Sequence, residues 1–159
     1  MAAKRGIDWK ALLTSLGLVC LAAFLGSLFT SPNVNSDWYE SIKPDITPPN
    51  YVFPIVWSVL FFLIGLSMYF AWTNSKPENK KMIAIVFGIN LALNIIWSIL
   101  YFGMKNAAGA FIGLILLWIS IIYMILVLRK IDKTSACLLI PYLLWVSFAG
   151  ILNLLSVLK

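Results

Sequence analysis

The sequence predicts an all-α integral membrane protein built as a bundle of five transmembrane helices. Hydrophobic residues make up 62% of the 159 residues and charged residues only 11%, and the mean hydropathy is +0.94. A soluble domain of this length buries only about 70% of its unfolded surface, so it would leave much apolar surface in water. Five apolar runs of about 20 residues each match the length that crosses the hydrocarbon core of a bilayer.

Short polar segments separate the five runs and divide the chain into helices and loops. We expect helices at 9–29, 52–72, 82–102, 107–128 and 136–158. These helices occupy most of the chain, so we expect a single membrane domain over residues 1–159. The first helix resembles a signal peptide, because basic residues precede its apolar core. No small-x-small cleavage motif follows it, and we expect it to be retained.

Lysine and arginine are distributed unevenly over the loops, which predicts the orientation of the bundle. The N-terminal segment, second loop and fourth loop carry three each: Lys4, Arg5, Lys10, Lys76, Lys80, Lys81, Arg129, Lys130 and Lys133. The first loop, the third loop and the C-terminus carry one each: Lys43, Lys105 and Lys159. We therefore expect a multi-pass cell-membrane protein with a cytoplasmic N-terminus, and with the first loop and the C-terminus outside. The net charge of +6 then reflects topology, with anionic membrane lipid rather than nucleic acid as the expected partner.

The predicted spans contain no carboxylate and no imidazole side chain. The chain has no histidine, and all six acidic residues fall in loops or termini. Proton-coupled transporters usually need a protonatable group near the middle of the membrane, which argues against a pump or a proton symporter. The same absence removes the usual general base and the commonest metal ligand, so we predict neither ordinary enzymatic catalysis nor a metal site.

The segment 43–57, KPDITPPNYVFPIVW, predicts a rigid loop ahead of the second helix. Pro48 and Pro49 cannot continue a helix, because proline lacks the amide hydrogen and fixes φ. Pro54 falls in the first turn of the following helix, where proline is tolerated. The loop therefore brings aromatic residues to the rim of the bundle. These residues are Tyr51, Phe53 and Trp57.

Polar and aromatic residues share one face of the third and fifth predicted helices. Asn90, Asn94 and Trp97 lie at helical spacing on the third helix, as do Trp145 and Asn153 on the fifth. Asparagine is costly in lipid unless it is paired, so these faces point into the bundle. One interpretation is that the amides only bond neighbouring helices. The other is an uncharged internal ligand pocket, where a small alanine beside Trp145 leaves space for a flat, apolar molecule.

Small residues recur every four positions on two helices. Ala84, Gly88 and Ala92 form such a ladder on the third helix, and Gly109 and Gly113 form a shorter one on the fourth. These ladders let helices approach closely, either within one bundle or between two copies. We predict a homodimer through the third helix, with internal packing as the alternative.

Three motifs in order along the chain resemble the TspO/MBR family, the translocator proteins. The first is Trp38-Tyr39 followed by the segment 43–57, which is similar to the family pattern WY…KPxWxPPxWVFxPVW. The second is NIIWSILYFG at 94–103, and the third is PYLLWVSFAGILN at 141–153. The resemblance covers most of the chain and is specific, although the region before Trp38 matches only loosely.

The resemblance implies a five-helix bundle with an internal pocket that is capped by the first loop. Family members bind porphyrins, haem, drug-like aromatics and, in animals, cholesterol, and they often dimerise. By position, the implied ligand-binding residues are Tyr51, Phe53, Pro54, Trp57, Asn94, Trp97, Trp145, Phe148, Ala149 and Leu152. The predicted function is therefore binding of porphyrin- or haem-type tetrapyrroles and similar apolar ligands, for transport, sensing or regulation, with no obligatory cofactor.

The chain departs from the family pattern at two loop positions. Ile46 and Tyr51 stand where the family carries tryptophans. Some bacterial members degrade porphyrins in light and oxygen with tryptophans implicated, so Tyr51 favours binding over turnover. A porphyrin-degrading enzyme is the alternative function, and a structural or regulatory membrane subunit is a second one. Sterol binding is not predicted, because Leu117, Tyr123 and Arg129 match only a loose pattern.

Overall fold

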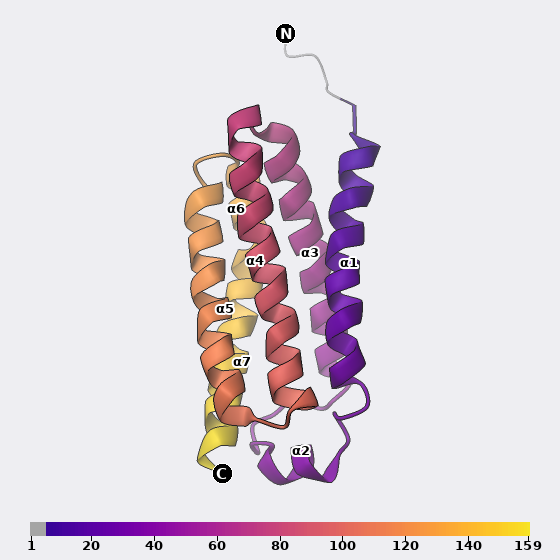
Figure 1. Ribbon diagram of the computed structural model, residues 1–159, viewed down its shortest axis with the longest axis vertical. Coiled ribbons are helices and arrows are strands. Elements are labelled where there is room, and N and C mark those ends of the chain that lie inside the picture. Colours follow the sequence, from indigo (N-terminus) through magenta and orange to yellow (C-terminus); the bar gives the residue numbers. More distant parts are fainter. Residues whose placement is uncertain (1–5) are drawn as a thin grey trace.

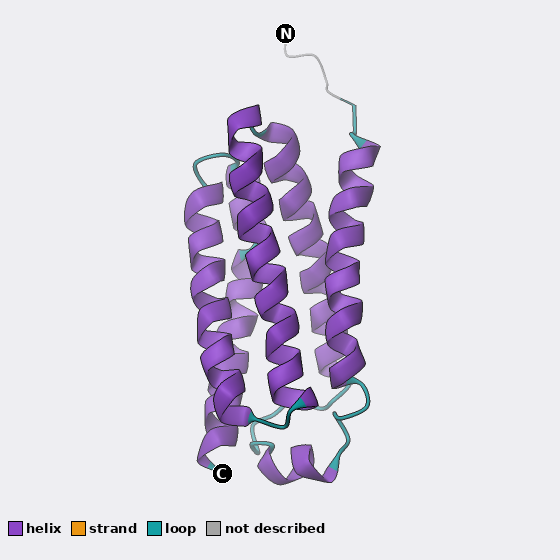
Figure 2. Cartoon of the chain, viewed as in Figure 1, coloured by secondary structure: helices purple, strands orange, loops and turns teal. Residues whose placement is uncertain are grey.

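The computed structural model describes residues 6–159, which form a bundle of long, nearly parallel helices (Figure 1). Within these residues, five helical segments are long and apolar enough to cross a membrane: Trp9–Thr30, Val52–Asn74, Pro77–Gly103, Ala107–Leu128 and Lys133–Leu158. The described residues contain no strand (Figure 2). The predicted fold class is confirmed.

The elements follow one another as helices joined by short loops. They are α1 (Trp9–Thr30), α2 (Asp37–Ile42), α3 (Val52–Asn74), η1 (Pro77–Asn79), α4 (Lys80–Ser98), η2 (Ile99–Gly103), α5 (Ala107–Leu128), α6 (Lys133–Leu138) and α7 (Ile140–Leu158). The last apolar run is divided into α6 and α7 at Leu139. Proline at position 141 lacks the amide hydrogen that would bond the carbonyl of Cys137, so the helix is interrupted there.

The two sets of basic residues lie at opposite ends of the bundle. The start of α1 and the connections α3–α4 and α5–α6 lie at one end of the bundle, whereas α2, the α4–α5 connection and the C-terminus lie at the other (Figure 1). By these bounds, the first end carries Lys10, Lys76, Lys80, Lys81, Arg129, Lys130 and Lys133, and the second carries Lys43, Lys105 and Lys159. Lys4 and Arg5 lie outside the described residues. This separation follows from an odd number of spans, and which end faces the cytoplasm stays a prediction.

The core lies between the helices, where α1 packs on α3 and α4, and α5 packs on α4 and α7. Side chains such as Ile64, Phe87 and Tyr142 are fully buried there. Helices α1 and α3 approach closely at Gly65, where a Cβ would lie 2.6 Å from a methyl carbon of Leu16 and 3.5 Å from its Cα, so the Leu16 side chain would have to shift. Large apolar side chains on the outer helix faces remain exposed, as expected of surfaces that contact lipid.

Candidate ligand pocket

The short helix α2 and residues 43–51, which we call the Pro-rich loop, lie at the end of the bundle opposite the start of α1 (Figure 1). Ser36 caps α2, because its hydroxyl accepts a hydrogen bond from the amide of Tyr39 at 3.3 Å. The Tyr39 ring is buried against Phe102, with ring centroids 5.6 Å apart, and meets Tyr101 at 6.4 Å. The loop then runs to Val52, where α3 begins, and Pro54 lies in the first turn of α3 as predicted.

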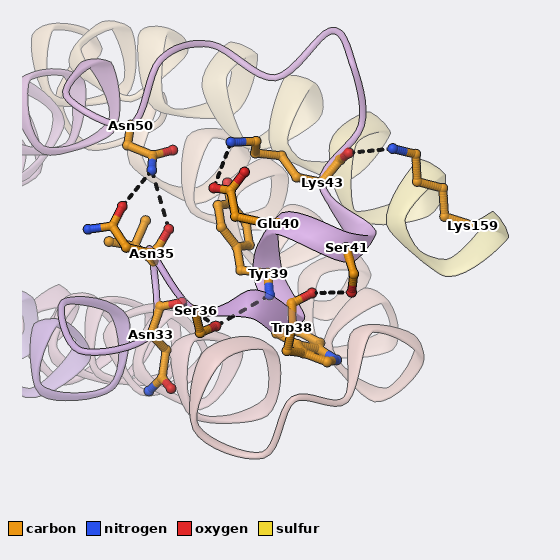
Figure 3. A network of polar contacts seen from close by, with 11 residues as sticks. Asn33, Asn35, Ser36, Trp38, Tyr39, Glu40, Ser41, Lys43, Asn50 and Lys159 are labelled. Carbon is orange, nitrogen blue, oxygen red and sulfur yellow. Dashed lines mark hydrogen bonds and ion pairs between the residues drawn. The ribbon is translucent and has the colours of Figure 1, made fainter.

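Polar contacts hold the Pro-rich loop against its neighbours (Figure 3). The side-chain amide of Asn50 donates to the Asn35 side chain at 2.9 Å. At the other end of the loop, the Lys159 ammonium donates to the backbone carbonyl of Lys43 at 2.6 Å, and Lys43 pairs with Glu40 at 2.8 Å. The loop is therefore held both to the segment after α1 and to the end of α7.

Beneath this loop lies a cavity of about 240 Å³ between α1, α3 and α4. Its walls are aromatic rings, small residues and amide or hydroxyl side chains. The lining residues are Ala23, Gly26, Ser27, Thr30, Ser31, Val34, Tyr39, Asn50, Phe53, Pro54, Trp57, Phe61, Asn94, Trp97, Ser98 and Phe102. None of them carries a charge at neutral pH. We call this space the main cavity.

Five of the ten predicted ligand-binding residues line the main cavity. They are Phe53, Pro54, Trp57, Asn94 and Trp97. Two more, Ala149 and Leu152, line a smaller adjoining cavity of about 30 Å³. Phe53, Trp97, Tyr39 and Phe102 line both spaces. These four rings therefore form an aromatic partition between the main cavity and the face of α7.

The remaining three predicted residues lie outside the main cavity. Trp145 packs edge-on against Phe53, with ring centroids 5.8 Å apart, and against Phe148 at 5.6 Å. The indole nitrogen of Trp145 is buried and has no hydrogen-bond partner. Tyr51 lies directly before α3 and is 68% exposed. The ligand-binding role of each residue stays a prediction.

Buried amides link the pocket wall to three helices. The Asn94 side chain donates to the Tyr142 hydroxyl at 3.1 Å, and this hydroxyl donates to the Asn90 side chain at 3.3 Å. Asn90 in turn donates to Ser120 on α5 at 2.8 Å. Asn90 thus bonds neighbouring helices, as the first interpretation proposed, whereas Asn94 both bonds Tyr142 and lines the main cavity.

A second set of bonds fixes the ring of Trp97. Its indole nitrogen donates to the Asn153 side chain at 3.2 Å, and Asn153 donates to the carbonyl of Ala107 at 2.8 Å. The ring also stacks on Tyr101, with centroids 5.5 Å apart. Asn153 therefore holds the ring of Trp97 in position.

The cavity environment is electrically neutral. Burial raises the pKa of the Tyr39 phenol well above its ordinary value, and charge repulsion from Tyr101 and Glu40 adds to the rise. The phenol therefore stays protonated at physiological pH. No group of three or more His, Cys, Asp or Glu side chains gathers anywhere in residues 6–159. The described pocket suits an apolar molecule with few polar atoms, because unpaired charges are costly to bury.

None of the ligand-binding residues predicted from the sequence lies on α1, although α1 forms one wall of the main cavity. Ala23, Gly26, Ser27 and Thr30 all line the main cavity. They recur at spacings of three and four in an otherwise bulky apolar helix, which is the signal that indicates a close-packed or cavity-facing side. Gly26 packs closely against α4, since a Cβ there would lie 3.3 Å from the Ser98 hydroxyl oxygen.

Comparison with known proteins identifies the family. The model of the TspO/MBR family matches residues 15–158. The chain belongs to the TspO/MBR family. The match begins within α1 and continues to the last residue of α7, so it includes most of the first helix, which the sequence motifs matched only loosely. The protein is thus an integral, multi-pass membrane protein of the TspO/MBR family.

Relatives in the TspO/MBR family come from archaea, bacteria and animals. The chain is 40% identical to the tryptophan-rich protein TspO of Archaeoglobus fulgidus, over 89% of this chain and 92% of the relative. It is 37% identical to the tryptophan-rich protein TspO of Chlorobaculum tepidum, over 87% and 88% respectively. It is 32% identical to the translocator protein of Bos taurus, over 86% and 82%.

Proposed function

We propose that this protein binds porphyrin- or haem-type tetrapyrroles and similar apolar ligands in the main cavity, for transport, sensing or regulation. The observation that carries the proposal is an uncharged cavity walled by Phe53, Trp57 and Trp97, with Asn50 of the Pro-rich loop at its edge. Flat aromatic walls favour a flat, conjugated ligand through stacking and edge contacts. Membership of the TspO/MBR family supports the same ligand class.

The volume of the cavity bears on how such a ligand enters. The main cavity measures about 240 Å³, below the roughly 300–1,000 Å³ of typical ligand pockets. The adjoining cavity beside Ala149 adds only about 30 Å³, so binding of a porphyrin requires the rings that line both spaces to move apart. The described lining has no cation, so carboxylates of a porphyrin would have to remain at the loop end of the bundle. We expect porphyrins with few carboxylates to bind more tightly than those with many.

Protoporphyrin is expected to quench the tryptophan fluorescence of the purified protein, and Trp57→Ala should weaken this binding by about 1–3 kcal/mol. The indole of Trp57 lines the main cavity, so its loss removes a stacking wall. Titration of protoporphyrin against the protein in detergent gives the Kd. Trp9→Ala is the matched control, because Trp9 is 63% exposed at the start of α1. Absence of quenching in the unmodified protein would contradict the proposal and favour a structural subunit.

An alternative function is light- and oxygen-dependent degradation of porphyrin at the same cavity. The exposed Tyr51, which replaces a tryptophan of the family pattern, favours binding over this activity. Illumination of the aerobic complex separates the two functions. Loss of the Soret band faster than in protein-free detergent, and faster still in Tyr51→Trp, would support the enzyme. An equal rate supports binding alone.

The proposed location is the cell membrane, with the basic end of the bundle in the cytoplasm. The Pro-rich loop and the C-terminus would then face the outside, and the main cavity would open towards the outer leaflet. Labelling of a cysteine introduced at the exposed position 46 by an impermeant reagent in intact cells checks this orientation.

The proposed assembly is a homodimer through the small residues Ala84, Gly88 and Ala92 of α4. These residues line an open groove of about 760 Å³ between α1 and α4, and a Cβ on Gly88 would meet no atom within 4 Å. The small-residue ladder of α4 is therefore not used for packing within the chain. The ladder of Gly109 and Gly113 on α5 does pack within the chain, because a Cβ on Gly113 would lie 3.3 Å from Leu100.

Gly88→Leu is expected to shift the protein from dimer to monomer while leaving the bundle folded. The leucine would occupy open space within the chain but would prevent the close approach of a second α4. Size-exclusion chromatography with light scattering in detergent measures the change. Gly17→Leu is the matched control, because Gly17 on α1 is also exposed and unobstructed but does not line the groove. A dimer that survives Gly88→Leu would place the seam elsewhere.

A further inference from the structure

A second groove lies at the basic end of the bundle, far from the main cavity. It measures about 460 Å³ and is formed by the end of α5, the following loop, α6 and the first residue of α7. Its floor is apolar and includes Ile125, Ala136 and Ile140. Arg129, Lys130 and Lys133 also line it, together with Cys137. We call this space the basic groove.

The three cations of the basic groove have no acidic partner in the described structure. The ion pairs of residues 6–159 are Lys43–Glu40 and Lys159–Asp45, both at the opposite end of the bundle. All three groove cations are exposed. Three like charges that share one concave surface repel each other, so an anion placed among them is favoured.

The acid closest in sequence, Asp132, is engaged elsewhere. One of its carboxylate oxygens accepts from the amide of Ser135 at 2.6 Å, and the other accepts from the side chain of Asn74 at 2.8 Å. These bonds fix the turn between α5 and α6 and tie it to the end of α3. Asp132 therefore builds the loop that presents the cations and forms no ion pair with them within the described residues.

The position of the groove specifies which anion fits. Arg129 and Lys130 directly follow α5, which ends at Leu128, and Lys133 begins α6, so we expect the three cations at the level of lipid headgroups. The apolar floor continues from them along the helices, where Ile140 is 47% exposed. A ligand that matches both parts carries a negative headgroup and a hydrocarbon chain, as an anionic phospholipid does.

We propose that the basic groove is a binding site for one anionic phospholipid, with its phosphate among Arg129, Lys130 and Lys133 and an acyl chain along Ile125 and Ile140. Arginine contributes a planar pair of donors to phosphate oxygens, and the lysines contribute point charges. The bound lipid would bridge α5 to α6 and α7. This site is separate from the main cavity and does not depend on the proposed function.

The test uses the full protein in detergent, with dioleoyl phosphatidylglycerol as the anionic probe and dioleoyl phosphatidylcholine as the neutral one. Native mass spectrometry counts bound lipid, and the rise in Tm reports its binding. We expect tighter binding of the anionic lipid, and at least a tenfold loss of its affinity in R129Q/K130Q/K133Q. The matched control, K76Q/K80Q/K81Q, removes the same charge from the same end and should retain affinity within about twofold, because these residues lie outside the groove.

A second pair of variants tests the apolar floor without changing charge. Cys137→Trp places a bulky ring in the groove from an exposed position, and we expect it to lose lipid binding as well. Cys20→Trp, from an exposed position on α1, should not. This pair also decides the matter if the triple variant does not fold.

Four results would overturn the proposal. Equal affinity for the two lipids would remove the need for an anionic headgroup. Equal losses of affinity for the anionic lipid in the two triple variants would indicate attraction by the overall positive charge of this end rather than binding at one site. Retained binding in Cys137→Trp would exclude the groove as the place of the acyl chain. An equal rise in Tm with glycerol phosphate would indicate a site for a small anion.

Discussion

Ala23→Phe is expected to lower porphyrin affinity at least tenfold while leaving the helix bundle folded. Ala23 lies on α1 and lines the main cavity, which measures only about 240 Å³. A phenyl ring at this position would take up space that the ligand needs, and forcing both into one cavity costs about 1–3 kcal/mol or more. The substitution removes no hydrogen bond and creates no cavity, so the unliganded fold should keep its stability.

Protoporphyrin titration followed by tryptophan quenching measures the loss, and thermal unfolding of the free protein checks the fold. Ala108→Phe is the matched control, because Ala108 is exposed in the first turn of α5 and adds the same ring away from the cavity. Unchanged affinity in Ala23→Phe would mean that the ligand does not occupy the main cavity. Equal weakening in both variants would point to a general effect of added bulk.

Tyr142→Phe is expected to destabilise the bundle by about 1–3 kcal/mol. Tyr142 is fully buried on α7, and its hydroxyl joins Asn90 and Asn94 of α4. Phenylalanine fills the same volume, so the substitution removes only the hydroxyl. Asn90 would lose a donor to its carbonyl oxygen and Asn94 would lose an acceptor for its amide, and water cannot replace either partner at this depth.

The free energy of unfolding in mixed detergent micelles measures this effect. Tyr123→Phe is the matched control, since Tyr123 on α5 is 52% exposed, and its loss should cost less than about 0.5 kcal/mol. Similar values for the two variants would show that the amide network contributes little. Asn94 also lines the main cavity, so Tyr142→Phe should additionally alter ligand affinity.

The predicted residues fall on both sides of one aromatic partition. Helical spacing alone placed Asn94 and Trp97 on an inward face, and both line the main cavity. It placed Trp145 on an inward face as well, where it packs behind Phe53. Periodicity states which face of a helix points inward, but it does not state which side of a neighbouring ring a residue reaches.

The α1 wall of the cavity shows the complementary limit. Ala23, Gly26 and Thr30 line the main cavity from α1, whose apolar composition predicts only that it spans the membrane. Their small side chains indicate a cavity only when the position of α4 is known, because a cavity is enclosed between two helix surfaces. The close distance between Gly26 and Ser98 is a property of that pair of helices.

The sequence by itself determined the membrane class, the five spans and the division of basic residues between two ends. These features depend on the length, polarity and order of segments, because each segment partitions into the bilayer according to its own hydrophobicity and flanking charges. The tertiary structure alone decided which helices enclose the main cavity, and that Tyr39, Phe53, Trp97 and Phe102 line both this cavity and the smaller one beside α7. The physical reason is that these cavities arise from packing between segments distant in sequence, and no local pattern specifies that packing.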